Sequence, residues 1–182
     1  MKLHTLFCFI IALAAMSCTE KKEAAQAAPL TVDSLMTEAE AFLGDTVTVE
    51  GTCSHLCKHG GRKAFLVGAD STTVLRCEAT PEMGGAFAPD CVGQTLTVRG
   101  IVRENRIDEK AVAQMEALYL ASDTTARKHE ACDTEKKAQG QAELNSFEAR
   151  MADYRAKIAA RTEAEAKPYL SFYYIEALSY SK

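Results

Sequence analysis

Four residues that can bind a metal ion alternate through one short segment of the chain, at Cys53, His55, Cys57 and His59. A two-residue spacing is the period of a β-strand, so an extended backbone would turn all four side chains to one face. Thiolate and imidazole groups are ligands that suit zinc and copper. The segment therefore predicts a transition-metal site or a redox-active thiol, and it indicates no substrate.

The reach of a strand limits how many of these residues can bind one ion. Residues of a straight strand rise about 3.3 Å each, which puts Cys53 and Cys57 about 13 Å apart. We therefore expect His55, Cys57 and His59 to bind the metal where the strand turns. Counting back through the next two turns places Cys77 on a neighbouring strand, level with His55, where it would complete a tetrahedral site. Cys53 is the alternate ligand. Zinc is the expected metal, and copper or haem is the alternative.

The alternation of inward and outward side chains along the strand also allows a purely structural interpretation of the cysteines and histidines. Val47 and Val49 alternate with polar residues and must face the core. An even strand would turn Cys53 and its i+2 neighbours to the same inward side, as small buried hydrophobic side chains beside a hydrogen-bonded histidine. A β-bulge at Gly51 would instead turn the whole set outward.

The chain begins with the features of an export signal, because Lys2 precedes an apolar run of about ten residues, which is too short to span a bilayer. Residues 13–18 read Leu-Ala-Ala-Met-Ser-Cys and resemble a bacterial lipobox. The resemblance implies a signal peptide over 1–17, a palmitoylated Cys18 as membrane anchor, and a flexible tether over 18–30. A simple secretory signal is the alternative. Thr19 stands where inner-membrane lipoproteins carry Asp, so we expect an outer-membrane lipoprotein facing the periplasm or the cell exterior.

Seven cysteines raise the question of pairing. Cys8 would leave with the signal peptide and Cys18 would carry lipid, which leaves an odd number in a compartment that oxidises thiols. A disulfide between Cys77 and Cys91 is the alternative to a metal role for Cys77. Cys132 is expected to stay unpaired.

Periodicity predicts a helix followed by strands. Apolar residues at helical spacing predict a helix over 30–43, with Asp33 or Ser34 as its N-cap and Gly44 as its end. Alternating or β-branched runs bounded by turn residues then predict five strands. We place these strands at residues 46–57, 62–67, 72–79, 94–106 and 113–120.

Five strands with one irregular connection between the third and the fourth are the order of an OB-fold barrel. The phrases from Gly44 to Gly51 and from Gly93 to Gly100 are alike, each reading glycine, polar, Thr, apolar, Thr, Val, charged, glycine. They resemble the first and fourth strands of small exported bacterial OB-fold domains of the tRNA-anticodon-like class. The resemblance covers residues 44–121 and implies a fold that is mainly β with α, a five-stranded OB-fold-like barrel followed by a long C-terminal helix.

We therefore expect an OB-fold-like domain with an N-terminal helix over 31–121 and a helical extension over 122–182. A helix over 141–166 carries an apolar stripe at Leu144, Phe147, Met151, Tyr154 and Ile158. The stripe suits either a coiled-coil seam, which implies a homo-oligomer or an envelope-protein partner, or a helix packed on its own barrel. Residues 169–180 are aromatic, and both a helix and an edge strand stay open for them.

Composition weighs against nucleic acid as the partner, because the formal net charge is −4 and the chain has no tryptophan. No nucleophile triad or phosphate-binding loop is recognisable, so we do not expect an enzyme. The expected function is a lipid-anchored envelope protein that binds a transition metal, or a metal-containing ligand such as haem, through its Cys/His strand. The alternative is an OB-fold binding or adaptor module with structural cysteines, whose partner is an oligonucleotide, a saccharide or an envelope protein.

Overall fold

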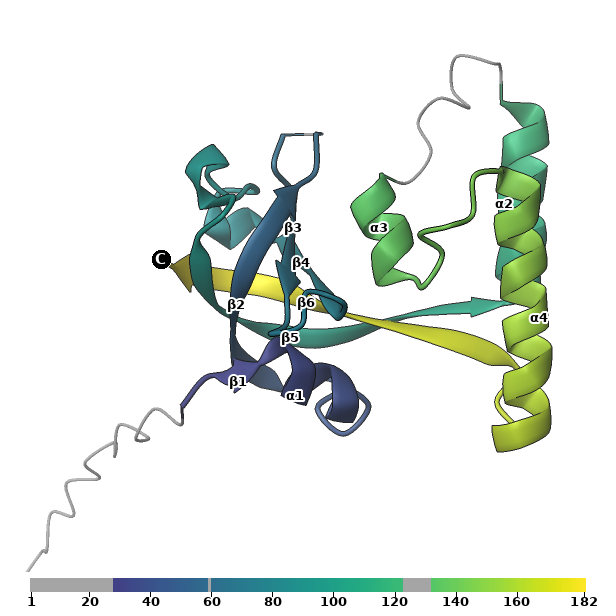
Figure 1. The fold of residues 1–182 in the computed structure, drawn as a ribbon, viewed down its shortest axis with the longest axis horizontal. Coiled ribbons are helices and arrows are strands. Elements are labelled where there is room, and N and C mark those ends of the chain that lie inside the picture. The colour runs from purple at the N-terminus through teal and green to yellow at the C-terminus, as the bar shows by residue number, and fades with distance from the viewer. Residues whose placement is uncertain (1–27, 59, 123–131) are drawn as a thin grey trace, which may run out of the picture.

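The structure is a computed structural model that describes residues 28–58, 60–122 and 132–182. Five strands close a barrel in the order β2-β3-β4-β6-β5, and β5 returns to β2 (Figure 1). Neighbouring strands are antiparallel, except that β4 and β6 are parallel. This arrangement is compatible with an OB-fold-like domain and confirms the predicted fold class. The barrel strands are β2 (Thr46–Leu56), β3 (Lys63–Val67), β4 (Val74–Ala79), β5 (Thr95–Asp108) and β6 (Tyr169–Ser181).

Alternate side chains of each strand fill the barrel. Val47 and Val49 face inward, as their alternation with polar residues predicts. Gly100 is required where β5 shifts register against β6, because a Cβ there would collide with the carbonyl oxygen of Glu176. The inward side chains form one continuous core together with Cys91 from the connection before β5, and the strands contribute Val47, Val49, Cys53, Leu66, Leu75, Cys77, Leu96, Val98, Val102 and Ile175.

The helix α1 (Val32–Glu38) packs against β2 and is shorter than predicted. Its N-cap is Thr31, not Asp33 or Ser34, and the Thr31 side chain accepts a hydrogen bond from the Ser34 backbone N–H. A two-residue strand, β1 (Leu30–Thr31), precedes it and runs parallel to β2. A Cβ at Gly51 would lie 2.6 Å from a methyl group of Val32. Gly51 therefore permits this close packing, and β2 has no bulge there.

The predicted strand over 113–120 is wrong, because these residues lie in the helix α2 (Glu109–Ala121). The Asp108 side chain caps α2 by accepting a hydrogen bond from the Ala111 backbone N–H. The strand that closes the barrel is β6, which follows α3 (Asp133–Ala138) and α4 (Phe147–Glu165). The helices are thus inserted between the fourth and fifth barrel strands. Two short 3₁₀ helices, Pro81–Met83 and Pro89–Cys91, form the connection between the third and fourth strands.

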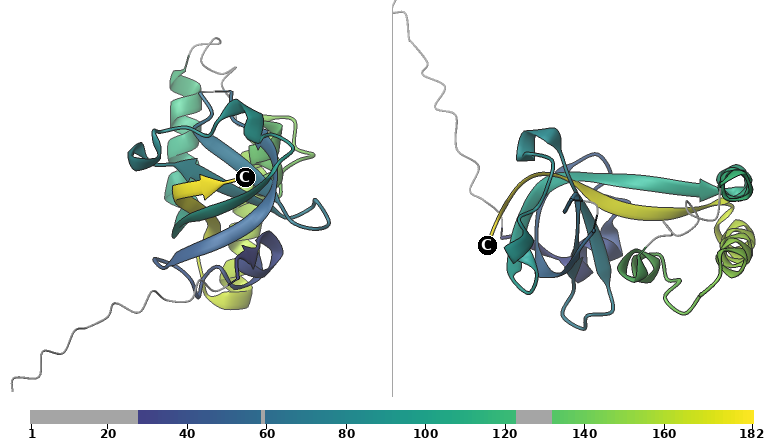
Figure 2. Two further views of the ribbon diagram at one scale, coloured as in Figure 1. Left: turned by 90° about the vertical axis from the view of Figure 1, so that its left-hand side faces the viewer. Right: turned by 90° about the horizontal axis from the view of Figure 1, so that it is seen from above.

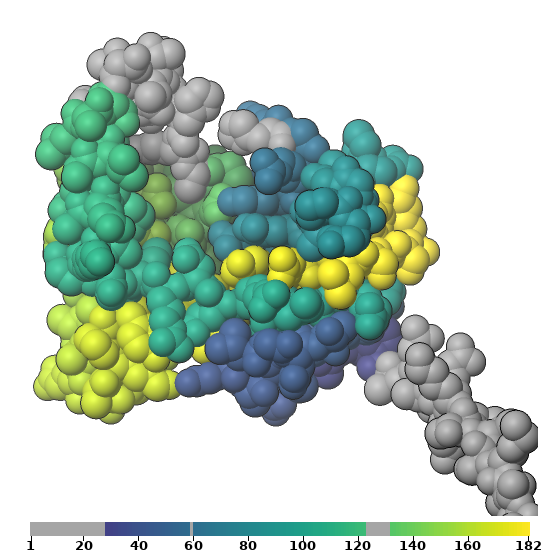
Figure 3. Space-filling view, turned by 180° about the vertical axis from the view of Figure 1, so that it is seen from behind, coloured from purple at the N-terminus to yellow at the C-terminus, as the bar shows by residue number. Residues whose placement is uncertain are grey.

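β5 and β6 stay paired beyond the barrel and carry the helical insertion at their far end (Figure 2). We call residues 103–108 of β5 and 169–174 of β6 the ribbon. From behind, the two strands run between the barrel and the helices (Figure 3). None of the helices in the described ranges has the length and hydropathy to cross a bilayer. β6 lies beyond the boundary expected at residue 121, yet it belongs to the barrel.

A second core holds the insertion on the ribbon. Met151, Tyr154 and Ile158 of the predicted stripe are buried here with Ile107 and Val112, and Phe147 packs against them. The helix begins at Phe147 and not at residue 141, so Leu144 precedes it. Tyr119 of α2 stacks on Phe147 of α4, with ring centroids 4.0 Å apart. The helical unit therefore has its own small hydrophobic centre, separate from that of the barrel.

Candidate functional site

The strand that carries the cysteines and histidines changes face between Cys53 and His55. Cys53 pairs with Leu66 and His55 with Phe65, so Ser54 is an extra residue in a β-bulge. Leu66 lies in the barrel core with Cys53, and Phe65 beside it points to the opposite face. The His55 and Phe65 rings are 5.8 Å apart on that outer face. The bulge thus puts Cys53 inside the barrel and His55 outside.

Cys77 also lies inside the barrel. It pairs with Ala64, and Ala64 pairs in turn with Leu56, not with His55. The bulge accounts for this one-residue difference from the expected register. Cys77 and His55 therefore lie on opposite sides of the barrel wall, and this geometry gives no support to a site that joins them.

Three thiols lie together in the barrel core, at Cys53, Cys77 and Cys91, each with no exposed surface. Burial raises the pKa of the Cys53 thiol and, more strongly, that of the Cys77 thiol. A raised pKa disfavours the thiolate, which is the form that binds metal. All three are free thiols in the structure, and the disulfide between Cys77 and Cys91 stays a prediction.

Part of the predicted metal set remains on the outer side. Leu56 packs against the core, so Cys57 lies on the other side, where its Sγ accepts a hydrogen bond from the Lys63 backbone N–H at 3.3 Å. His59, the predicted lipidation site Cys18 and residues 18–27 of the tether lie outside the described residues. Within residues 28–58, 60–122 and 132–182, no three His, Cys, Asp or Glu side chains gather as a metal site.

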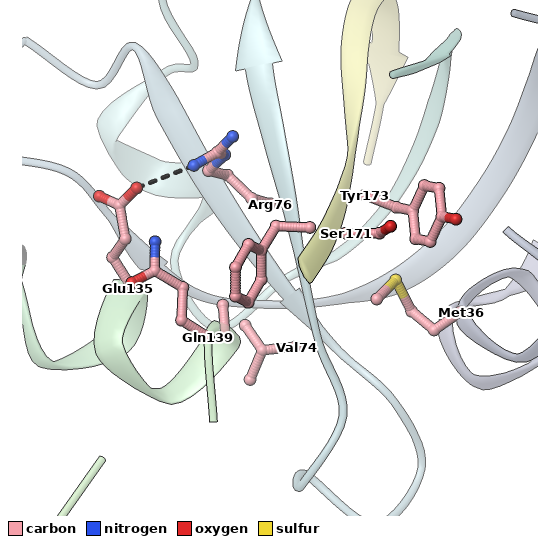
Figure 4. Close-up of a pocket in the computed structure, with 9 residues that line it drawn as sticks. Met36, Val74, Arg76, Glu135, Gln139, Ser171 and Tyr173 are labelled. Atoms are coloured by element: carbon pink, nitrogen blue, oxygen red, sulfur yellow. Dashed lines mark hydrogen bonds and ion pairs between the residues drawn. The ribbon is translucent and has the colours of Figure 1, made fainter. Parts of the chain in front are cut away.

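A pocket of about 190 Å³ lies where α3 rests on the barrel wall (Figure 4). Arg76 and Glu135 lie on one side of it, and Met36, Ser171 and Tyr173 on the other. We call it the α3 pocket. Its lining comes from α1, β4, α3 and β6, and consists of Met36, Val74, Arg76, Glu135, Ala138, Gln139, Ser171, Phe172 and Tyr173.

Glu135 attaches α3 to the barrel by charge. Its Oε1 accepts hydrogen bonds from Lys63 Nζ at 3.1 Å and from Arg76 Nη1 at 2.9 Å. Burial raises the pKa of the Glu135 carboxyl, but the two cations outweigh burial, so the pKa lies below its ordinary value. Arg76 also lies over the Tyr174 ring, 4.7 Å from its centroid. The carboxylate is therefore ionised and held from two strands.

A buried amide network attaches the other end of α3 to α4. The Tyr154 hydroxyl donates to Gln139 Oε1 at 2.8 Å, and Arg150 Nε donates to Gln141 Oε1 at 3.0 Å. The Gln141 amide nitrogen donates to the Arg150 carbonyl and to Asp153. Gln141 is 1% exposed and Arg150 is 7% exposed. One end of α3 is thus held by buried hydrogen bonds and the other by ion pairs.

The lining of the α3 pocket suits binding. Met36, Val74 and Phe172 supply apolar surface, while Ser171 and Tyr173 supply hydroxyl groups. None of the lining residues is a histidine or a cysteine. The pocket fits an apolar group that lies beside a polar or charged one.

The chain matches no protein-family model and no curated protein sequence. The function of the α3 pocket is therefore inferred from its geometry.

The Glu135 ion pairs predict a pH dependence of stability. Because the pKa of this carboxyl is lowered on folding, its contribution is fully present above the ordinary pKa of 4.5 and is lost as pH falls through the folded-state pKa. We expect Glu135→Gln to lower the free energy of unfolding by about 1–2 kcal/mol at neutral pH. The difference from wild type should shrink on acidification, as measured by chemical denaturation between about pH 3 and pH 7.

Glu143→Gln is the matched control, because Glu143 is exposed in the segment between α3 and α4. It should leave stability unchanged at every pH. A loss in Glu135→Gln that is equally large in acid and at neutrality would contradict the assignment.

Proposed function

We propose that the protein is a lipid-anchored binding module of the bacterial cell envelope, with its ligand site at the α3 pocket and with structural cysteines. The supporting observation is the position of the pocket. OB-fold barrels bind ligands on the face of their second and third strands, between the first loop and the loop before the fifth strand. β3 and β4 hold these places here, and the helical insertion replaces the latter loop.

The surroundings of the pocket favour some ligands over others. Lys63 and Arg76 are cations, but Glu78 and Glu135 lie among them, with Glu78 Oε1 3.1 Å from Arg76 Nε. This mixture does not suit a run of phosphates. It suits a polypeptide or saccharide that offers polar and apolar groups side by side. A protein or saccharide of the envelope is therefore favoured over an oligonucleotide.

Ala138→Trp tests the site, because the indole ring would fill the α3 pocket from the α3 side. The unmodified protein would be titrated with a short acidic peptide, a peptidoglycan disaccharide-peptide and a short single-stranded DNA. We expect one of the first two probes to shift backbone NMR signals of Val74, Ser171 and Tyr173, and Ala138→Trp to weaken that binding at least about tenfold.

Ala142→Trp is the control, since Ala142 is exposed beyond α3. It should bind as the wild type does. Signal shifts confined to another face, or unchanged affinity in Ala138→Trp, would reject the α3 pocket as the site.

Lipid attachment is tested at Cys18. Cys18→Ser should abolish incorporation of a clickable palmitate analogue and move the protein from the membrane fraction to the soluble fraction, because no acyl chains would hold it. Cys8→Ser should leave both unchanged, because Cys8 lies in the expected signal peptide. Membrane association that survives Cys18→Ser would contradict the anchor.

A second candidate function is metal binding by His55, Cys57 and His59. The supporting observation is that the buried His55 Nε2 has no hydrogen-bond partner among the described residues, and buried ring nitrogens are normally satisfied. Zinc is the first choice, and copper or haem iron is the alternative. Cys53 and Cys77 are not part of this proposal, because both lie inside the barrel.

Elemental analysis after purification under reducing conditions distinguishes this candidate. Wild type and Cys132→Ser, which removes a thiol outside the set, should retain one metal ion per chain. His55→Ala and Cys57→Ala should lose it. Equal metal content in all four proteins would reject the site.

A further inference from the structure

The contact between Glu135 and the barrel has the charge pattern of an occupied ligand site. Lys63 and Arg76 lie on β3 and β4, and Glu78 of β4 supplies one carboxylate, 4.0 Å from Lys63 Nζ and 3.1 Å from Arg76 Nε. The barrel alone therefore has two cations and one anion at this place. Glu135 supplies the missing negative charge from another element.

The fit of α3 to the barrel is incomplete. The helix has six residues and none of them is buried. The α3 pocket remains open behind it, beside Val74 and Phe172, although protein interiors are normally filled to the density of organic crystals. Charge therefore contributes more than apolar packing to holding this helix on the wall.

The two ends of α3 are attached to different parts of the molecule. Gln139 and Gln141 are anchored on α4 by the buried amide network. Gly140, between them, has a φ of +66°. Among the described residues, Lys137 Nζ also donates a hydrogen bond to the Ser71 carbonyl oxygen at 2.7 Å. The helix can thus leave the wall while the α4 anchor stays in place.

We propose that α3 is an internal substitute for an acidic peptide of a partner protein. The partner places a carboxylate between Lys63 and Arg76, inserts a neighbouring apolar side chain beside Val74 and Phe172, and displaces α3. A peptide is the occupant because the group now in place is itself the glutamate of a peptide segment. This inference rests on the proposed function, in that it names the partner and the regulation of the same pocket.

The experiment compares affinities of full mature chains for one probe, a fluorescein-labelled peptide of alternating Glu and Leu, by fluorescence anisotropy. Glu135→Gln should bind the peptide about tenfold more tightly than wild type, because the competing segment is weakened. Glu143→Gln, with the same change of charge, should bind as wild type does. Adding Arg76→Gln to Glu135→Gln should weaken binding at least about tenfold.

Hydrogen exchange supplies a measurement on the unaltered protein. Adding the peptide to wild type should accelerate exchange at amides 136–141, because Lys136, Gln139, Gly140 and Gln141 donate backbone hydrogen bonds within the α3 segment, while the amides of α4 keep their protection. This readout does not depend on the folding of any variant.

Three outcomes would overturn the inference. If wild type and Glu135→Gln bind the peptide with equal affinity, and both need Arg76 for it, then α3 is not an internal substitute for the peptide. The pocket would remain a binding site. Tighter binding by Glu135→Gln that does not depend on Arg76 would place the peptide elsewhere. Absence of peptide binding in every chain would exclude the acidic peptide, and the saccharide arm of the Ala138→Trp experiment would still test the pocket itself.

Discussion

The antiparallel pairing of β5 with β6 is the interaction on which the rest of the structure depends. Its inner half supplies two of the strands that close the barrel, and its outer half carries α2 and α4 on a separate hydrophobic core. Because the same two strands serve both units, the insertion has a fixed direction relative to the barrel. That direction brings α3 back onto β4, where Glu135 meets Lys63 and Arg76.

Local sequence signals were sufficient for most of the barrel. The alternation around Val47 and Val49 and the two similar glycine phrases predicted β2 and β5 because each strand has one buried and one exposed face. The apolar run near Leu118 led to the wrong prediction of a strand over 113–120, because Val112, Met115 and Tyr119 are equally well spaced for one face of a helix. β6 gave no clear alternation because residues 169–174 are all half-buried, and buried positions alternate with more exposed ones only from Ile175 onward. Its role depends on partners distant in sequence, which override local preference.

The candidate site was much less accessible to sequence reasoning. The cysteines and histidines are evenly spaced, but the bulge at Ser54 is set by pairing with β3, and one extra residue reverses the face of everything after it. The α3 pocket combines residues from four elements, between Met36 and Tyr173. Glu135 stands in a charged stretch that reads as a solvated helix. No local pattern distinguishes it from exposed neighbours such as Glu143.

The position of β6 between β4 and β5 has a consequence for how the chain acquires its fold. Until residues 169–181 arrive, β4 and β5 have no common neighbour on that side, and each exposes a row of unsatisfied backbone groups. To close this gap, residues 169–181 must pair with strands from which the whole helical insertion separates them in sequence. Such non-local pairing is slow compared with hairpin formation. A nascent chain emerging stepwise would therefore pass through a stage that attracts foreign strands, and protection by a chaperone would matter most at that stage.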